Sequence, residues 1–240
     1  MKILLIGAGG MLGQRVAAEA GRRGHEVTGV TRSGAGGATR ADASDAEAVA
    51  KLAAGCDAVV LAVPPPRDHP QPSSALVAAG HGVLSGLRKA GVSRLVVVGG
   101  AGSLEVAPGV RLIDTPQYPA AYRDTGLAQS ALLDLLRTQA QDLSWTYISP
   151  PVELRPGQRT GAYRLGGDQL LTDANGKSAI SAEDYAVALV DELERGRAIG
   201  RRITVAATGR DLAVRAARHR PQRLSMTALA SRRFAPVSSR

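Results

Sequence analysis

The chain opens with MKILLIGAGGMLG (residues 1–13), which is its most informative segment for the fold. The apolar run Ile3–Ile6 is short and tightly bounded, as expected of a buried strand. Three glycines follow it, at Gly7, Gly10 and Gly13, and residues 14–21 suit a helix. Glycine lets a ligand approach the backbone, and a helix start offers unpaired N–H groups with a partial positive charge. This order of strand, glycine turn and helix predicts a site for a dinucleotide pyrophosphate; the alternative is a tight turn without a ligand.

Length and composition indicate one α/β domain. The 240 residues suffice for one such domain and are too few for two full ones. Aromatic residues make up only 3% of the chain, so Val, Leu, Ile and Ala must fill the core, as parallel sheets prefer. The single cysteine, Cys56, excludes an internal disulfide and fits a reducing compartment. No apolar run reaches the roughly 18 residues of a membrane helix, and no cleavable leader precedes the first strand, so we expect a cytoplasmic protein without a membrane partner.

The positive charge is concentrated at the C-terminal end. The net charge is +9, and residues 211–240 contribute +6 of it through seven arginines and one acid, which leaves +3 for residues 1–210. We expect residues 211–240 to form a disordered basic tail; an arm that binds polyanions is the alternative. Because only Phe234 could stack on a base in this tail, nucleic-acid binding is not favoured.

Strand and helix patterns alternate along the rest of the chain. Strands are expected at residues 26–30, 39–41, 57–63, 94–98, 144–149 and 202–206. Helices are expected at residues 44–54, 74–90, 127–141 and 181–194, with Ser44 and Ser181 as N-caps. This alternation predicts a Rossmann-type, doubly wound parallel sheet. Residues 1–210 then form one domain, with a small substrate-side subdomain mainly from residues 151–180, in which residues 160–171 suggest a hairpin or irregular lid.

Several strings resemble one branch of the short-chain dehydrogenase/reductase superfamily. The first turn has the spacing G-x-x-G-x-x-G, and the further strings are VVVGGAGSLEV, WTYISPP, TGAYRLGGDQLL and ISAEDYAVALVDELE. Together they resemble the atypical, NAD(P)H-binding, NmrA-like group that includes flavin-reductase-like and biliverdin reductase B-like proteins. The similarity covers roughly residues 1–208. It implies an NAD(P)-binding domain and a reductase that passes hydride to a flavin.

The end of the second expected strand bears on the choice of dinucleotide. NAD-specific sites usually place an acid there for the ribose hydroxyls, but no acid occurs between Glu26 and Asp42. Arg32 instead follows the strand, and its guanidinium suits a 2′-phosphate, to which Ser33 could add a hydroxyl donor. The sequence therefore favours NADPH, with NADH as the alternative. Asp42 either contacts the adenine edge or serves a turn.

The other residues expected to bind the cofactor follow from their positions at strand ends and in the first turn. Ligands of open α/β sheets lie beyond the carboxyl ends of the strands. The residues assigned on this basis are Ala8, Met11, Leu12, Ala62, Val63, Pro64, Gly99, Gly100, Pro150 and Val152. His69 could meet either substrate or solvent. No metal site is predicted.

The catalytic pattern of the superfamily is incomplete. A Tyr-x-x-x-Lys pair would let a tyrosine protonate a carbonyl oxygen, but the residues four after Tyr118 and Tyr122 are Tyr122 and Gly126. The serine position falls near Ala101, with Ser103 two residues further. Ser103 and Tyr122 are the candidate catalytic residues, and Tyr163 and Arg164 are further candidates for the acceptor side.

Three functions remain open at this stage. Hydride transfer to a flavin or a quinone-like small molecule needs no Tyr-Lys pair, since a reduced flavin can take its proton from water. A non-catalytic, NmrA-like redox sensor would bind the dinucleotide and act through a protein partner. An epimerase- or dehydratase-like enzyme for a sugar nucleotide is disfavoured by the missing pair.

Overall fold

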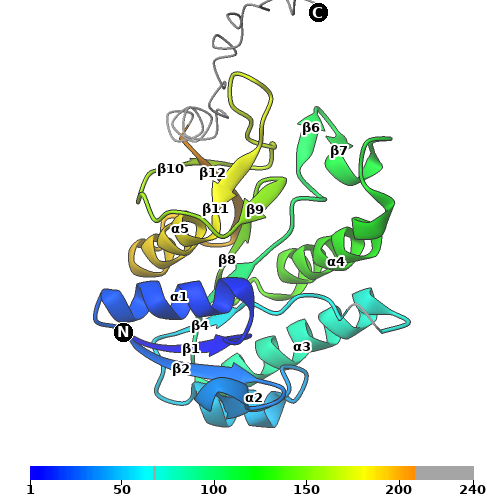
Figure 1. The fold of residues 1–240 in the computed structure, drawn as a ribbon. Helices are drawn as coiled ribbons and strands as arrows, with labels where there is room; N and C mark the ends of the chain where they lie inside the picture. The colour runs from blue at the N-terminus through cyan, green and yellow to red at the C-terminus, as the bar shows by residue number, and fades with distance from the viewer. Residues whose placement is uncertain (67–68, 209–240) are drawn as a thin grey trace, which may run out of the picture. The chain divides into compact units, whose positions relative to one another are not determined.

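The computed structural model describes residues 1–66 and 69–208, and its centre is an eight-stranded, mostly parallel sheet (Figure 1). The strand order is β10-β12-β8-β5-β4-β1-β2-β3. The strands are β1 (Lys2–Ile6), β2 (Glu26–Thr31), β3 (Thr39–Arg40), β4 (Ala58–Leu61), β5 (Arg94–Val98), β8 (Ser144–Ser149), β10 (Tyr163–Gly166) and β12 (Arg201–Ala207). Only β10 runs antiparallel to its neighbour within this sheet. The predicted Rossmann-type fold is confirmed.

Helices cover both faces of the sheet because its central strands are apolar on both sides. The helices are α1 (Met11–Arg22), α2 (Ala46–Ala53), α3 (Pro72–Ala90), α4 (Arg123–Gln139) and α5 (Ala182–Arg195). In β1, Ile3 and Leu5 pack with the core under α1 and α5, whereas Leu4 and Ile6 pack with the core under α2, α3 and α4. This alternation is the two-residue period of a strand buried on both faces.

Short elements complete the carboxyl edge of the sheet. Two small sheets pair β6 (Glu105–Ala107) with β7 (Val110–Arg111) and β9 (Glu153–Arg155) with β11 (Ala179–Ser181). Single 3₁₀ turns are η1 (Ala35–Gly37), η2 (Leu112–Asp114) and η3 (Ala120–Tyr122). Because β1, β2, β4, β5 and β8 are parallel, the loops that follow them gather at one edge.

Two local expectations were wrong. Ser44 does not cap α2: Asp45 is the N-cap, and its carboxylate accepts hydrogen bonds from the amides of Glu47 and Ala48, while Ser44 donates its hydroxyl to Asp42. The aspartate that directly precedes the helix therefore caps it in place of the serine. Residues 160–171 are not a separate hairpin, because β10 pairs with β12 along the edge of the main sheet.

Two further observations concern the chain as a whole. None of the helices within residues 1–66 and 69–208 is long and apolar enough to cross a membrane. The expectation of a disordered basic tail at residues 211–240 lies outside the described residues.

Candidate functional site

The turn after β1 depends on two glycines whose backbones are tightly enclosed. Gly7 has φ +96°, and a Cβ there would lie 2.4 Å from the carbonyl oxygen of Ala62. A Cβ on Gly13 would lie 2.1 Å from the carbonyl oxygen of Gly7. Both contacts are with backbone, which cannot swing aside, so only glycine brings β1, β4 and α1 this close together.

The third glycine leaves the start of α1 open. Gly10 is the N-cap of α1 in extended conformation, so no side chain of this residue can bond to the first helical amides, and the first turn of α1 contains no acidic residue. Free N–H groups and the helix dipole then favour an external anion. Met11 and Leu12 supply the first amides, while the Leu12 side chain packs into the core under α1 and α5. The residues therefore fit a dinucleotide pyrophosphate.

A cavity of about 640 Å³ opens beside this turn, in the range of small-molecule sites. It lies among the loops after β1, β2, β3 and β4. Seven of the residues expected to bind the cofactor line it: Gly7, Gly10, Arg32, Ser33, Asp42, Val63 and Pro64. His69 lines it as well, and its Nδ1 accepts a hydrogen bond from the amide of Gln71. The cavity has the position of the adenosine half of a dinucleotide site.

The first turns of α3 form a wall of the cavity that the sequence analysis missed. Ala75, Leu76, Ala78 and Ala79 face it. Three of these are alanines, whose short side chains fill little of the cavity. The signal in the sequence is the run of small residues, SSALVAAG (residues 73–80), directly after the proline-rich loop.

Arg32 and Asp42 lie on the same cavity and differ in how they are held. Asp42 Oδ1 accepts hydrogen bonds from the amide (2.8 Å) and hydroxyl (2.7 Å) of Ser44. These bonds, and more weakly the charge of Arg32, lower the pKa of the Asp42 carboxyl. Asp42 thus stabilises the turn at residues 42–44 and also lines the cavity. Arg32 is exposed, and within the described residues its guanidinium makes no hydrogen bond or ion pair.

The residues expected at the nicotinamide end lie outside this cavity, at the ends of β5 and β8. Gly99 donates its amide to the carbonyl of Ile148, and a Cβ on Gly99 would lie 2.1 Å from the ring of Tyr147. The amide of Gly100 donates to Tyr147 Oη (3.0 Å). Burial raises the pKa of Tyr147, so this phenol is a neutral structural support. Tyr147 therefore sets the path of the chain as it leaves β5.

The other predicted cofactor residues are placed as follows. Pro150 is buried and directly follows β8, whereas the Val152 side chain is 56% exposed. Ala62 is buried behind the glycine turn, and the amide of Ala8 donates to the carbonyl of Val30. The hydroxyl of Ser149, at the end of β8, is buried without a hydrogen-bond partner among the described residues.

The two candidate catalytic residues are not brought together by a shared contact. The hydroxyl and carbonyl oxygens of Ser103 both accept hydrogen bonds from Arg202 Nη1 (2.9 Å each), and Arg202 also pairs with Asp168. Arg202 of β12 thus joins Ser103, in the loop after β5, to Asp168, in the loop after β10. Tyr122 is the N-cap of α4, and its side chain is 60% exposed.

The two acceptor-side candidates, Tyr163 and Arg164, use their polar atoms in hydrogen bonds within the fold. Tyr163 donates its hydroxyl to Asp191 on α5, and burial together with this bond raises the pKa of Tyr163 to about 12. The guanidinium of Arg164 donates to the carbonyl oxygens of Ala207 and Thr172.

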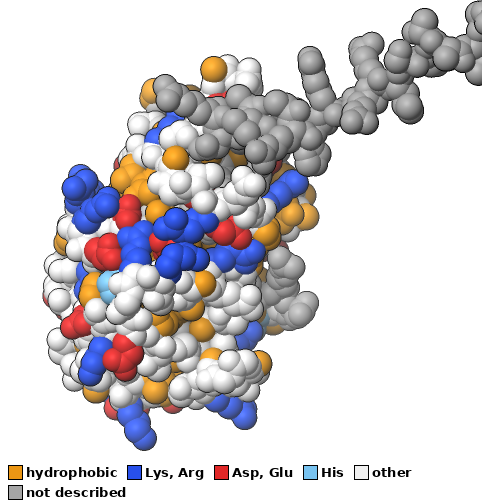
Figure 2. Space-filling view, turned by 60° about the vertical axis from the view of Figure 1, so that its left-hand side comes forward, with side chains coloured by type: hydrophobic (Ala, Val, Ile, Leu, Met, Phe, Trp, Pro, Cys, Tyr) orange, Lys and Arg blue, Asp and Glu red, His pale blue; other side chains and the backbone are white. Residues whose placement is uncertain are grey.

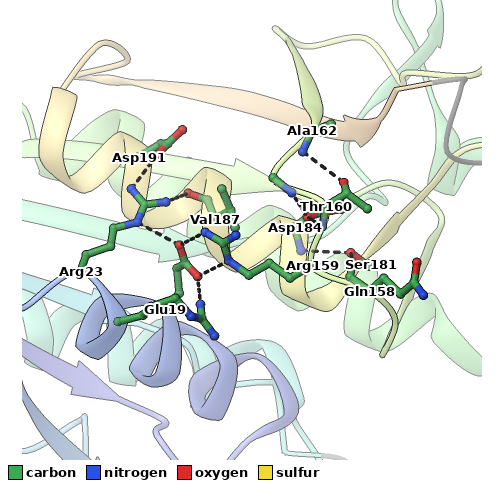
Figure 3. A network of polar contacts seen from close by, with 12 residues as sticks. Glu19, Arg23, Gln158, Arg159, Thr160, Ala162, Ser181, Asp184, Val187 and Asp191 are labelled. Atoms are coloured by element: carbon green, nitrogen blue, oxygen red, sulfur yellow. Dashed lines mark hydrogen bonds and ion pairs between the residues drawn. The ribbon is translucent and has the colours of Figure 1, made fainter.

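Residues 156–162 are held against the face formed by α1 and α5 (Figure 3). Asp184 accepts from the amides of Thr160 (2.7 Å) and Gly161 (2.8 Å), and Ser181 donates its hydroxyl to the carbonyl of Gln158. Arg159 forms two hydrogen bonds with Glu19, whose side chain is only 2% exposed.

Basic and acidic side chains interleave on this side of the molecule. Hydrogen bonds from Arg159, and then from Arg23, lower the pKa of Glu19 to about 2 in spite of its burial. Arg23 also pairs with Asp191 and Glu194. Figure 2 shows arginine and lysine side chains gathered with acidic ones over the middle of this face. Because Arg23 and Arg159 are paired with these acids, their charges stabilise the packing of residues 157–162 against α1 and α5.

Comparisons with known proteins agree with the geometry of the glycine turn. A family model for NAD(P)H-binding domains matches residues 7–195. The curated "Uncharacterized protein YwnB" of Bacillus subtilis (strain 168) is 40% identical over 218 residues, covering 85% of this chain and 98% of the relative.

Two solved structures are similar over almost their whole length. A "putative exported protein" from Burkholderia pseudomallei is 47% identical with a TM-score of 0.78, covering 86% of this chain and 99% of that chain. A "putative NADH-flavin reductase" from Streptococcus pneumoniae TIGR4 is 37% identical with a TM-score of 0.76, covering 87% and 100%.

Proposed function

Because this chain belongs to the NAD(P)H-binding family, we propose that it is a reductase that prefers NADPH and passes hydride to a flavin or quinone-like small molecule. The single observation that carries the preference for NADPH is the position of Arg32 on the cavity wall. No acidic residue lies between Glu26 and Asp42 to receive the ribose hydroxyls of NADH. A guanidinium without a partner is suited to a 2′-phosphate.

Each part of the site has a role in this proposal. The open start of α1 holds the pyrophosphate, and Asp42, Val63 and Pro64 border the adenosine. Gly99, Gly100 and Pro150 border the nicotinamide at the ends of β5 and β8. The bound dinucleotide supplies the hydride; the protein holds the acceptor beside it and keeps water away. The "putative NADH-flavin reductase" from Streptococcus pneumoniae supports a flavin as the acceptor.

The experiment measures absorbance at 340 nm with NADPH or NADH and with FMN, riboflavin or a quinone. Arg32→Ala is expected to raise KM for NADPH about 10- to 100-fold, as for a lost charge-assisted hydrogen bond, and to change KM for NADH less than about twofold. Arg40→Ala is the matched control, since Arg40 is an exposed arginine near Arg32 that is not among the residues lining the cavity. An equal loss for both dinucleotides in Arg32→Ala would refute the 2′-phosphate assignment.

NADPH binding without turnover would point to a different function. Saturable NADPH binding by fluorescence, with no reduction of any acceptor, would refute the reductase. It would favour a dinucleotide sensor that acts through a protein partner.

A further inference from the structure

A phenol lies between the loop that leaves β5 and the first turns of α4. A Cβ on Gly126 of α4 would be 2.5 Å from Tyr118 Oη, and a Cβ on Gly102 of the loop would be 3.2 Å from the same atom. Neither glycine has positive φ, so neither is required by the backbone at its own position. Their missing side chains make room for the hydroxyl of Tyr118.

This place borders the proposed nicotinamide end. Gly102 is two residues beyond Gly100, and the carbonyl of Gly102 accepts a hydrogen bond from the amide of Ile113. Gly126 is four residues after Tyr122, where a Tyr-x-x-x-Lys pattern would have its lysine. The Tyr118 hydroxyl thus occupies the space into which a side chain at position 126 would project.

The hydroxyl is held loosely. It donates one long hydrogen bond, 3.3 Å, to the carbonyl of Tyr122. The side chain is partly buried, and this burial raises the pKa of Tyr118, so that the phenol carries its proton at neutral pH. A protonated hydroxyl with only a weak partner is free to donate to a ligand.

A positive charge stands near this phenol. The charge of Arg123 offsets part of the rise in the pKa of Tyr118 that burial causes, and so stabilises the phenolate. The Arg123 guanidinium donates a 3.1 Å hydrogen bond to the carbonyl of Ile113. On the packed turn η2, Asp114 is paired with Arg111. Residues 99–104 of the facing loop carry no ionisable side chain. Arg123 is therefore the charge that acts most directly on the phenol.

We propose that Tyr118, assisted by Arg123, is the proton donor to a quinone-type acceptor, which gives this chain a carbonyl-reducing centre without a Tyr-Lys pair. The proposal rests on the reductase function proposed above and deepens it by naming the acceptor class. Tyr122, which the sequence alone offers for this role, has a more exposed ring and no hydroxyl hydrogen bond within the described part of the chain.

Hydride from NADPH adds to one quinone oxygen, so NADPH becomes NADP⁺ and the quinone becomes a hydroquinone anion. Tyr118 Oη gives its proton to the anionic oxygen, and the neutral hydroquinone results. The phenolate on Tyr118, stabilised by Arg123, then takes a proton from water. Flavin reduction can draw its proton from water directly and does not depend on Tyr118.

The test compares two acceptors in one variant. Tyr118→Phe is expected to lower kcat for menadione about 100-fold, as for a lost general acid, and kcat for FMN less than about threefold. NADPH affinity, measured by calorimetry without an acceptor, should stay within about twofold and show that the variant is folded. Tyr122→Phe is the competing variant: a larger menadione loss there than in Tyr118→Phe would overturn the assignment.

A spectroscopic titration supplies a readout that does not need turnover. The difference in tyrosinate absorbance between the native protein and Tyr118→Phe isolates this one phenol. In an Arg123→Met background the same difference should show a higher pKa, because the stabilising charge is gone. An unchanged pKa would overturn the role of Arg123.

Different results would overturn the reductase function and the role of Tyr118. Failure of the native protein to reduce any acceptor overturns the reductase and Tyr118 together. Reduction of menadione at equal rates by the native protein and Tyr118→Phe overturns Tyr118 alone, as does reduction of FMN with none of menadione.

Discussion

Helices α1 and α5 pack together on one face of the sheet, yet their N-termini are completed in opposite ways (Figure 1). The N-cap of α5 is Ser181, which accepts from the amide of Asp184, and its first turn contains Glu183 and Asp184. The N-cap of α1 is Gly10, and its first turn contains no acid. The first amides of α5 are therefore hydrogen-bonded by side chains of this chain, whereas those of α1 are free to bind an anion.

The acids of α5 also reach beyond their own helix. Asp184 accepts the amides of Thr160 and Gly161, and Glu183 accepts the amide of Gly157 (2.6 Å). The acidic residues at the start of α5 thus hold residues 157–161 in place. Similar helix dipoles therefore contribute to stability where side-chain oxygens accept from the first amides, and to ligand binding where a glycine leaves those amides free. Changes at α5 should lower stability, and changes at α1 should lower affinity.

The largest effect is expected from Gly13→Ala. Its Cβ would meet the backbone of Gly7 at 2.1 Å and would push α1 away from β1. We expect the free energy of unfolding to fall by about 3 kcal/mol and NADPH binding to weaken more than about 100-fold. Urea unfolding and fluorescence titration measure the two quantities.

Gly21→Ala is the matched control in the same helix, since a Cβ there meets nothing within 4 Å. It should stabilise the protein by about 0.5–1 kcal/mol and leave affinity unchanged. If both alanines behaved alike, the packing explanation for Gly13 would be wrong.

Asp184→Ala should produce the second-largest effect, and on stability alone. It removes a buried carboxylate that accepts two amides and the Thr160 hydroxyl, so the free energy of unfolding should fall by about 2–3 kcal/mol. NADPH affinity should stay within about twofold at a temperature where the variant is folded. A tenfold loss of affinity without loss of stability would contradict the division of roles between α5 and α1.

The elements that could be predicted from the sequence are those that depend on neighbouring residues in the chain. The glycine turn and β5 follow from apolar runs with clear boundaries, and β8 follows from aromatic and β-branched residues that end at Pro150. The Ser181 cap follows from its spacing to Asp184. The same spacing rule failed for Ser44, because Asp45 offers a competing oxygen one residue later. A local rule decides only where the neighbouring residues do not compete for the same amides.

Contacts between distant segments could not be predicted in this way. Arg202 occupies the Ser103 hydroxyl from 99 residues away, and β10 joins the sheet through β12, which is far along the chain. The slot around Tyr118 requires glycines at positions 102 and 126, and no periodicity connects those three residues. Such sites arise from tertiary packing and leave only single glycines as a signal in the sequence.

The smallest change in stability is expected from Gly10→Asp, which gives α1 an acidic N-cap like Asp45 of α2. The site tolerates it, because Gly10 has φ −74° and a Cβ there would lie 3.4 Å from its nearest neighbour. Asp should complete the first amides and raise the stability of the ligand-free protein by about 0.5 kcal/mol. Its charge should weaken NADPH binding about 30-fold, since it takes the place of the pyrophosphate. Gly10→Asn distinguishes the effect of the negative charge from the effect of a side chain at the helix start. It should stabilise α1 similarly but weaken NADPH binding less than Gly10→Asp does. Thermal unfolding without ligand and fluorescence titration would give the two values, and a parallel fall of stability and affinity in Gly10→Asp would mean that α1 is not held open for an anion.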